Sequence, residues 1–329
     1  MSAEPKEAEP TALDPAPGEL PRPAERPTLY FVGVTTGRSS IRPVFPRWAA
    51  ELGLGDVPLV GVDLPLHAPR EDYRRIVDFV ATDPLSAGAL VTTHKLDLYG
   101  ACEDLFARVD PLARLMGEVS CLSKRDGVLV AHAKDPISAG LAVDAIVAPG
   151  YWRDTGAEAF LMGGGGSAIA ISWYLTRPER GADRPVRLVV SDRDPQRLDA
   201  LLRVHAELGT DVPVECVQVP GPDGNDTVLA GLAGGSLVVN ATGLGKDAPG
   251  SPLSGVAPFP RDAIAWDLNY RGELVFLDQA RARQVRAEDG WVYFLHGWTQ
   301  VIAEVFGIEI PTSGPRFEAL GAIAAGVRR

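Results

Sequence analysis

The stretch Met162-Gly163-Gly164-Gly165-Gly166-Ser167-Ala168 decides the fold of this chain. It joins a short apolar run, Ala159–Met162, which is typical of a buried strand, to a second apolar run over residues 168–175, which is typical of a helix. Glycines allow a tight turn and a close approach of the backbone to phosphate, and a helix N-terminus offers N–H donors to an anion. The turn therefore predicts a dinucleotide-binding site, with pyrophosphate contacts from Gly163, Gly165, Gly166 and Ser167.

An acidic residue follows the glycine turn at the spacing that this type of site requires. Residues 186–190 are rich in β-branched side chains, and Asp192 stands just after them. A carboxylate at this place accepts hydrogen bonds from ribose hydroxyls and repels a 2′-phosphate, which favours NAD. Arg193 beside it could bind that phosphate, so NADP is the alternative. A flexible glycine loop and a solvated turn that caps the next helix are the non-functional interpretations of the same residues.

Composition limits the classes of function. The chain has 329 residues, 46% of them hydrophobic, and a formal net charge of −11. This length predicts two domains, and the negative charge disfavours nucleic acid and anionic membranes as partners. The sequence shows neither an apolar run of membrane-spanning length nor a signal layout, so we expect a cytoplasmic protein. Three scattered cysteines, Cys102, Cys121 and Cys216, predict neither a disulfide framework nor a metal site.

Strands and helices alternate along most of the chain. Residues 1–27 are rich in Pro, Ala and Glu, and they predict a disordered tail. From Thr28 onward the pattern predicts strands over 29–32, 59–62 and 89–92 with helices over 46–52 and 72–82, which together make a mainly parallel α/β layer. A second round of strands is predicted over 159–162, 186–190, 214–217, 236–240, 263–267 and 288–294. The expected fold class is α/β, with an N-terminal α/β domain followed by a Rossmann-type, doubly wound nucleotide-binding domain.

The order of motifs in this chain resembles that of shikimate dehydrogenases. Those enzymes carry a lysine at the end of a VTxPxK-like motif, an aspartate in a DGxxxGxNTD segment, a GAGGAxxA turn, an NATxxG strand end and a DxxY loop. The corresponding residues here are Lys95 in Val91-Thr92-Thr93-His94-Lys95, Asp135, the glycine turn at 163–166, Asn240-Ala241-Thr242-Gly243-Leu244-Gly245, and Asp267-Leu268-Asn269-Tyr270. The resemblance covers nearly everything after Thr28.

The resemblance implies roles for several residues. It makes Lys95 and Asp135 the catalytic pair that exchanges the substrate's hydroxyl proton while a hydride moves to or from nicotinamide. It adds cofactor contacts at Asn240, Thr242 and Gly243. It also implies a substrate domain over residues 28–134 plus 297–329 and an NAD(P) domain over residues 135–296. The other interpretations are that Asp135-Pro136 merely starts a helix and that Lys95 is simply solvated.

Departures from the family pattern point to a changed substrate. Of the two serines in the family's substrate loop, SxSP, only Ser39 remains, and Ile41 replaces the other. The family asparagine of GAxNT becomes Ser120, and the late glutamine becomes Gly297. Since a site built to bind hydroxyl groups discriminates strongly through them, losing several contacts favours another ligand. The substrate contacts that we expect are Ser39, Thr92, Ser120, Tyr270, His296 and Gln300, with a carboxylate clamp from Arg38 and Arg42 and added positive charge from Lys134.

The sequence thus predicts a shikimate dehydrogenase-like oxidoreductase. The expected reaction is reversible hydride transfer between NAD(P) and a secondary alcohol or ketone of a small cyclic hydroxy acid, with altered substrate specificity. One alternative is a genuine shikimate or quinate dehydrogenase, and another is a non-catalytic sensor that binds NAD(H). The expected partner is a small-molecule substrate rather than nucleic acid or membrane; no metal is expected, and assembly as a homodimer is left open.

Overall fold

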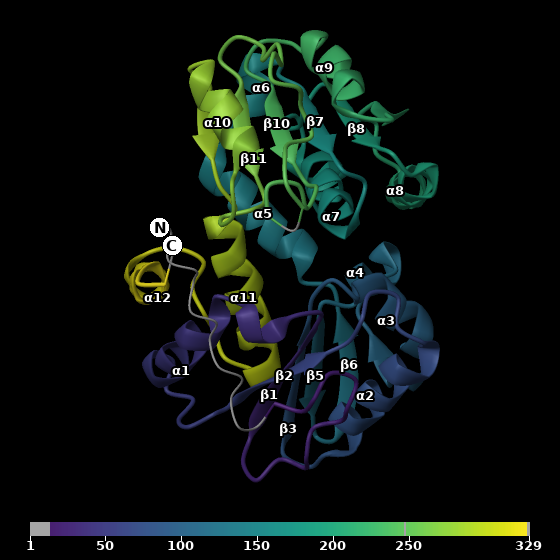
Figure 1. Cartoon of the computed structure of the whole chain (residues 1–329), viewed down its shortest axis with the longest axis vertical. Coiled ribbons are helices and arrows are strands. Elements are labelled where there is room, and N and C mark those ends of the chain that lie inside the picture. Colours follow the sequence, from purple (N-terminus) through teal and green to yellow (C-terminus); the bar gives the residue numbers. More distant parts are fainter. Residues whose placement is uncertain (1–13, 247, 328–329) are drawn as a thin grey trace. The chain divides into compact units, whose positions relative to one another are not determined.

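The computed structural model describes residues 14–246 and 248–327, and the chain divides into two units. The first unit comprises the chain up to Lys134 together with residues from Trp298 onward, and the second comprises Asp135–Gly297. Each unit is built around one six-stranded sheet with helices packed against it (Figure 1). The α/β fold class predicted from the sequence is confirmed.

The sheet of the first unit is mixed. Its strands follow the order β2-β1-β3-β5-β6-β4 and comprise β1 (Thr28–Gly33), β2 (Leu59–Asp63), β3 (Ser86–Val91), β4 (Arg108–Val109), β5 (Cys121–Arg125) and β6 (Val128–His132). Strands β1, β2 and β3 are parallel, whereas β5 runs antiparallel to both β3 and β6. The reversal occurs at Asp126 and Gly127, which both have positive φ and so form the tight turn typical of a hairpin.

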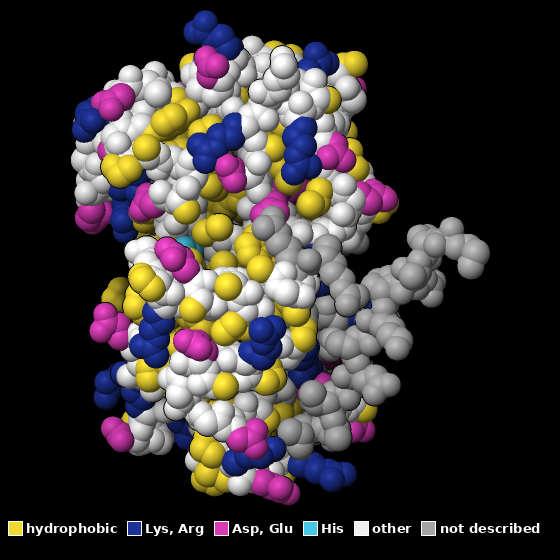
Figure 2. All heavy atoms as spheres, turned by 90° about the vertical axis from the view of Figure 1, so that its left-hand side faces the viewer, with side chains coloured by type: hydrophobic (Ala, Val, Ile, Leu, Met, Phe, Trp, Pro, Cys, Tyr) yellow, Lys and Arg dark blue, Asp and Glu magenta, His cyan; other side chains and the backbone are white. Residues whose placement is uncertain are grey.

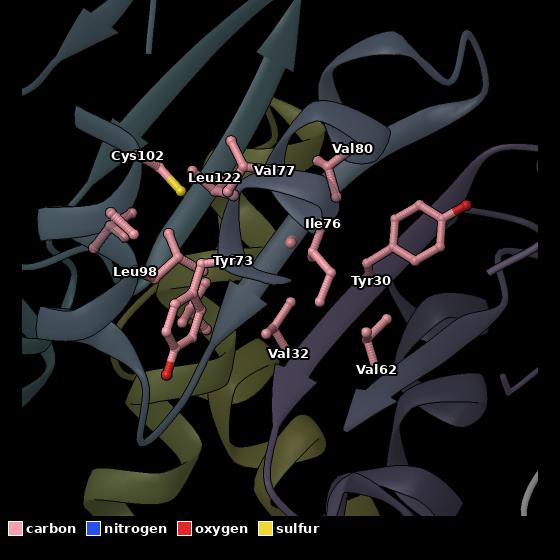
Figure 3. Packing of buried hydrophobic residues seen from close by; sticks show 14 of the residues in the cluster. Tyr30, Val32, Val62, Tyr73, Ile76, Val77, Val80, Leu98, Cys102 and Leu122 are labelled. Atoms are coloured by element: carbon pink, nitrogen blue, oxygen red, sulfur yellow. The ribbon is translucent and has the colours of Figure 1, made fainter. Parts of the chain in front are cut away.

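Helices of the first unit cover this sheet. They comprise α1 (Ile41–Glu51), α2 (Arg70–Thr82), α3 (Lys95–Cys102), α4 (Pro111–Met116) and α12 (Pro315–Ala325). The apolar face of α2, which carries Ile76 and Val77, belongs to one buried cluster with side chains of β1, β2, β3 and β5 (Figure 3). Helix α1 begins at Ile41, five residues before the predicted start at 46, because Pro46 is accommodated inside the helix at the loss of one backbone donor.

The second unit is a doubly wound sheet in which every strand pair is parallel. Its order is β12-β11-β10-β7-β8-β9, formed by β7 (Ala159–Met162), β8 (Leu188–Asp192), β9 (Val214–Gln218), β10 (Leu237–Asn240), β11 (Ile264–Asp267) and β12 (Arg286–Glu288). The helices are α5 (Asp135–Ile146), α6 (Tyr151–Thr155), α7 (Gly166–Thr176), α8 (Pro195–Leu208), α9 (Pro222–Ala230) and α10 (Val275–Ala282), and α11 (Trp291–Phe306) begins in this unit. The chain order reverses between β7 and β10, which is where such folds bind nucleotides.

One predicted strand is wrong. Residues 288–294 were expected to be extended, but β12 ends at Glu288 and α11 begins at Trp291. The side chain of Asp289 accepts a hydrogen bond from the backbone N–H of Trp291 at 3.0 Å, as residues before a helix commonly do. The aromatic run that suggests a strand packs instead as a helix, with the ring of Trp291 stacked on that of Phe294 at 5.2 Å.

Part of the predicted disordered tail has a defined structure. Residues 1–13 of that segment lie outside the described residues, but residues 14–27 bond to the first unit. The backbone N–H of Gly18 donates to the carbonyl of Asp63 at 3.0 Å, and the N–H of Ala24 donates to Asp83 Oδ2 at 3.0 Å. Hydrogen bonds and charge hold this segment, and a composition poor in apolar residues does not reveal them.

The described surface mixes charges of both signs. On the face shown in Figure 2, Lys and Arg side chains are interspersed with Asp and Glu rather than gathered into one basic surface. Over residues 14–246 and 248–327, no helix is both long enough and apolar enough to cross a membrane.

A buried histidine predicts how stability depends on pH. His205 on α8 is 6% exposed, its Nε2 lies 3.0 Å from Ser172 Oγ, and burial lowers its pKa from 6.5 to about 4. The unfolded chain binds a proton there below pH 6.5 while the folded chain does not, so stability is lost as pH falls from 6.5 towards 4. We expect a loss of about 2 kcal/mol from this group between pH 7.5 and 5 in urea unfolding.

The variant His205→Gln removes this titration and serves as the reference for that measurement. Its unfolding free energy should change less between pH 7.5 and 5 than that of the natural chain. Equal pH dependence of the two proteins would show that folding does not lower the pKa of His205.

Candidate active site

The topology of the first sheet brings four of the predicted site residues to the end of the sheet at which β1 and β3 finish. Strands β1 and β3 are parallel and end there, while β5 is antiparallel to β3 and begins there. Ser39 follows β1 after the turn Thr36–Arg38, and Thr92 and Lys95 follow β3. Ser120 immediately precedes β5, so the four residues gather at the same end of the sheet although they come from three separate segments.

Hydrogen bonds join these segments directly. The backbone N–H of Val119 donates to the carbonyl of Lys95 at 3.2 Å. The hydroxyl of Ser120, a residue that is 2% exposed, accepts the backbone N–H of Lys134 at 2.7 Å. Ser120, a predicted substrate contact, thereby also holds the chain one residue before Asp135.

Lys95 is the first residue of α3 and follows an unusual backbone conformation. Thr93 has a φ of 60°, which is uncommon for a β-branched residue and is found mainly where function or packing requires it. His94 is 1% exposed, its Nδ1 lies 3.1 Å from the hydroxyl of Tyr73, and burial lowers its pKa. A neutral, anchored His94 fixes the position from which the Lys95 side chain leaves the backbone.

Arg42 does not have the role predicted for it. Its guanidinium is buried against Asp14 at 2.5 Å and also donates to the carbonyls of Leu59 and Thr36 at 2.8 and 3.3 Å. These internal partners take up the group that we expected to clamp a substrate carboxylate. Arg38 lies at the end of the turn Thr36–Arg38 and is exposed.

Lys134 likewise forms an internal ion pair. Its Nζ lies 2.6 Å from Glu304 Oε2, and both side chains are largely buried. Burial alone would raise the pKa of Glu304, but the bond to Lys134 holds that pKa below its usual value. The positive charge predicted beside Asp135 is therefore balanced by a carboxylate.

The glycine turn of the second unit lies at the reversal point of the sheet. Gly163 has a φ of 102°, and its N–H donates to the carbonyl of Ser191 at 2.7 Å. A Cβ at this residue would lie 2.9 Å from the carbonyl oxygen of Ala241, so the neighbouring strand end approaches too closely for any side chain. Gly165 precedes α7, and Gly166 and Ser167 form its first turn, whose N–H groups suit a phosphate.

Asp192 ends β8 and is bonded to the glycine turn. Its Oδ2 accepts the N–H of Gly164 at 2.7 Å, and its Oδ1 accepts the N–H of Asp194 at 2.8 Å. Arg197 lies 3.7 Å from the same carboxylate, and Arg193 is exposed. The acid predicted for the ribose therefore lies next to the predicted phosphate site, within the same unit.

The buried side chain of Asn240 holds the loop that follows β10 through hydrogen bonds. Its side chain is fully buried, donates to Asp267 Oδ2 at 3.0 Å and accepts from both the N–H and the hydroxyl of Thr242. Asp267 is itself buried, and burial raises its pKa to about 6. Thr242 and Gly243 follow in the loop that this pair supports, at the same edge of the sheet as the glycine turn. The sequence analysis did not assign this anchoring role to Asp267.

Tyr293 lies close to the predicted catalytic acid, in the C-terminal group that the sequence places near the substrate together with His296 and Gln300. Its hydroxyl forms long contacts of 3.5 Å with both Asp135 Oδ2 and Ser167 Oγ, so it connects the predicted catalytic acid to the start of α7. Tyr293 belongs to the run that was expected to be a strand and that forms the start of α11 instead.

The other predicted residues are divided between the two units. Tyr270 packs its ring against Trp291 at 5.3 Å and Phe294 at 4.9 Å. His296 is 3% exposed, and burial lowers its pKa to about 4, which makes it neutral near pH 7. Asp135, Tyr270 and His296 belong to the second unit with the predicted cofactor residues. Lys95, Ser39, Thr92, Ser120 and Gln300 belong to the first.

Known proteins are similar to this chain in sequence or in fold. No protein-family model matches the chain. A protein of Methylocella silvestris named shikimate dehydrogenase (NADP(+)) is 30% identical over 288 residues, which cover 86% of this chain and 91% of that protein. The chain therefore belongs to the shikimate dehydrogenase family.

Two solved structures of lower identity have a similar fold. Quinate dehydrogenase from Corynebacterium glutamicum in complex with NAD is 20% identical, with a TM-score of 0.71 over 92% of this chain and 99% of that chain. A 5-ketofructose reductase of Gluconobacter is 16% identical, with a TM-score of 0.64 over 92% of this chain and 100% of that chain. At these identities the likeness concerns the fold alone.

Proposed function

We propose that this chain is an NAD(P)-dependent dehydrogenase that acts on the CH–OH group of a small cyclic hydroxy acid. The observation that carries the proposal is the glycine turn at the reversal point of an all-parallel sheet, with Asp192 bonded to it. Membership of the shikimate dehydrogenase family supports the same reaction class.

Lys95 and Asp135 supply the proton chemistry. A bound nicotinamide would accept or donate the hydride at the carbon that carries the hydroxyl group. During oxidation the Lys95 amine takes the hydroxyl proton, and during reduction its ammonium returns it. Asp135 holds the ammonium or shares its proton, and Tyr293 steadies that carboxylate through its 3.5 Å contact.

The cofactor that we propose is NAD. Asp192 places a negative charge beside the glycine turn, where it accepts ribose hydroxyl groups and repels a 2′-phosphate. Arg193 and Arg197 lie close to this carboxylate and are the groups through which NADP would bind instead. The remaining cofactor contacts are assigned to Gly163, Gly165, Gly166, Ser167, Asn240, Thr242 and Gly243, with Asn240 acting through the loop that it supports.

The substrate that we propose differs from shikimate. Lys134 is paired within the protein, and Ile41 and Gly297 replace polar residues of the family, which leaves fewer of the family's polar positions for a ligand. Contacts to the substrate are assigned to Ser39, Thr92, Ser120, Tyr270, His296 and Gln300. Arg38 is the guanidinium nearest to Ser39 along the chain and is assigned to the substrate's carboxylate.

Absorbance of reduced nicotinamide tests this function. The purified protein is mixed with NAD or NADP and with shikimate, quinate, their amino and deoxy analogues and other cyclic hydroxy acids. We expect turnover with NAD to exceed that with NADP, and an analogue to exceed shikimate. Efficient turnover of shikimate would contradict the altered specificity, and nucleotide binding without turnover of any compound would indicate a sensor.

A further inference from the structure

The N-terminal segment contributes a buried carboxylate to the loop that carries Ser39. Asp14 Oδ1 accepts the N–H of Gly61 on β2 at 2.8 Å, while its Oδ2 pairs with Arg42 Nη2 at 2.5 Å. Both side chains of this ion pair are 8% exposed. Removing one partner of such a buried pair leaves the other charge without a counter-charge, which is strongly unfavourable.

Arg42 connects Asp14 to the turn that precedes Ser39. Its Nε donates to the carbonyl of Thr36 at 3.3 Å, and its Nη1 donates to the carbonyl of Leu59 at 2.8 Å. A Cβ on Gly61 would lie 2.2 Å from Arg42 Nη2 and 2.2 Å from Thr36 Oγ1, so glycine leaves the space that both side chains occupy. These contacts hold the turn Thr36–Arg38 against β2.

Backbone groups on the outer edge of β2 bind both Arg42 and the N-terminal segment. Strand β2 is an edge strand, and alternate residues, Leu59, Gly61 and Asp63, direct their backbone groups away from β1. These groups bind Arg42, Asp14 and the N–H of Gly18, respectively. Asp63 Oδ1 also accepts the N–H and hydroxyl of Thr36 at 2.8 and 2.6 Å. Residues 14–18, β2 and the turn thus form one hydrogen-bonded body.

We propose that Asp14 is a positioning residue for substrate binding, which acts through Arg42 to hold the turn Thr36–Arg38 and the adjoining Ser39 in place. The proposal rests on the proposed function, which assigns Ser39 and Arg38 to the substrate's acid group. Without Asp14 the buried guanidinium of Arg42 has lost its counter-charge and moves toward water, and the carbonyl of Thr36 then loses one of its two donors and keeps only the N–H of Ser39 at 3.1 Å. Loosening this loop weakens the capture of substrate rather than the proton chemistry at Lys95.

Substrate kinetics test the proposal with Asp14→Asn, which keeps the size of the side chain and removes its charge. With quinate or shikimate as the probe, we expect KM to rise at least about tenfold, while kcat and the dissociation constant of NAD stay within about twofold. Asp14→Glu, which retains the charge, should recover part of the affinity. The matched control is Asp56→Asn, which breaks the exposed ion pair with Arg26 in the same segment and should leave KM unchanged.

A double variant separates positioning from folding. Replacing the pair by Asp14→Leu with Arg42→Met removes both buried charges, so the protein should fold stably, yet the Thr36 carbonyl still has no guanidinium. We expect KM to remain high in this variant. A natural KM in a stably folded double variant would overturn the proposal.

Amide hydrogen exchange tests the anchor without any substrate. In Asp14→Asn the amides of Gly61 and Ser39 should exchange at least about tenfold faster than in the natural chain. If the natural chain turns over neither probe nor any other cyclic hydroxy acid of the panel, the proposed function fails, while faster exchange at Ser39 still supports the anchoring role. Unchanged exchange at both amides would overturn it, whatever the activity.

Discussion

Lys95→Ala is expected to lower kcat about 10²- to 10⁴-fold, the range over which a positioned acid or base contributes. The hydroxyl proton of the substrate then has no amine to receive it, whereas the nucleotide still binds through the second unit. The affinity for NAD should therefore stay within about twofold. Stopped-flow absorbance of reduced nicotinamide measures the first quantity, and calorimetric titration with NAD measures the second.

Two further substitutions test whether the loss of kcat is specific to the Lys95 amine. Lys95→Arg keeps the positive charge but cannot release its proton near neutral pH, so kcat should stay low. Leu96→Ala changes the next residue of α3, whose side chain is 46% exposed, and should leave kcat unchanged. Turnover by Lys95→Ala within about tenfold of the natural rate would remove Lys95 from the proposed mechanism.

Local signals predict the second unit well. The glycine turn, Asp192 and most of the apolar runs fall at or within two residues of the strand ends, because buried parallel strands are short, apolar and followed by turn residues. The run over 288–294 misleads for the same reason, since its aromatic residues suit a strand as well as a buried helix. Asp289, which bonds to Trp291, is the signal that favours the helix.

Long-range pairing explains the site residues whose roles the sequence does not reveal. Arg42 and Lys134 look available for an anion, yet their carboxylate partners lie 28 and 170 residues away along the chain. Asn240 matches a cofactor motif, but its buried amide bonds to Asp267, 27 residues further on. A sequence pattern shows which groups can bind a ligand, whereas only the fold shows which of them are already bonded within the protein.

The two glycines at positions 163 and 165 are expected to respond differently to alanine. Gly163→Ala places a Cβ 2.9 Å from the carbonyl oxygen of Ala241 at a φ of 102°, so the backbone must shift. We expect this variant to lose about 1–3 kcal/mol of stability without nucleotide present. Gly165→Ala meets no atom within 4 Å, and its stability should change by less than about 0.5 kcal/mol.

Nucleotide binding distinguishes the roles of these residues. The Cβ of Gly165→Ala would occupy the approach to the first turn of α7, where the pyrophosphate is assigned, so NAD affinity should fall at least about tenfold despite normal stability. Gly255→Ala, which also meets no atom within 4 Å and lies in the same unit, is the control and should bind NAD normally. If Gly165→Ala keeps the natural affinity in calorimetric titration, the phosphates bind away from this turn, and the glycines serve only the close approach of β7 to β10.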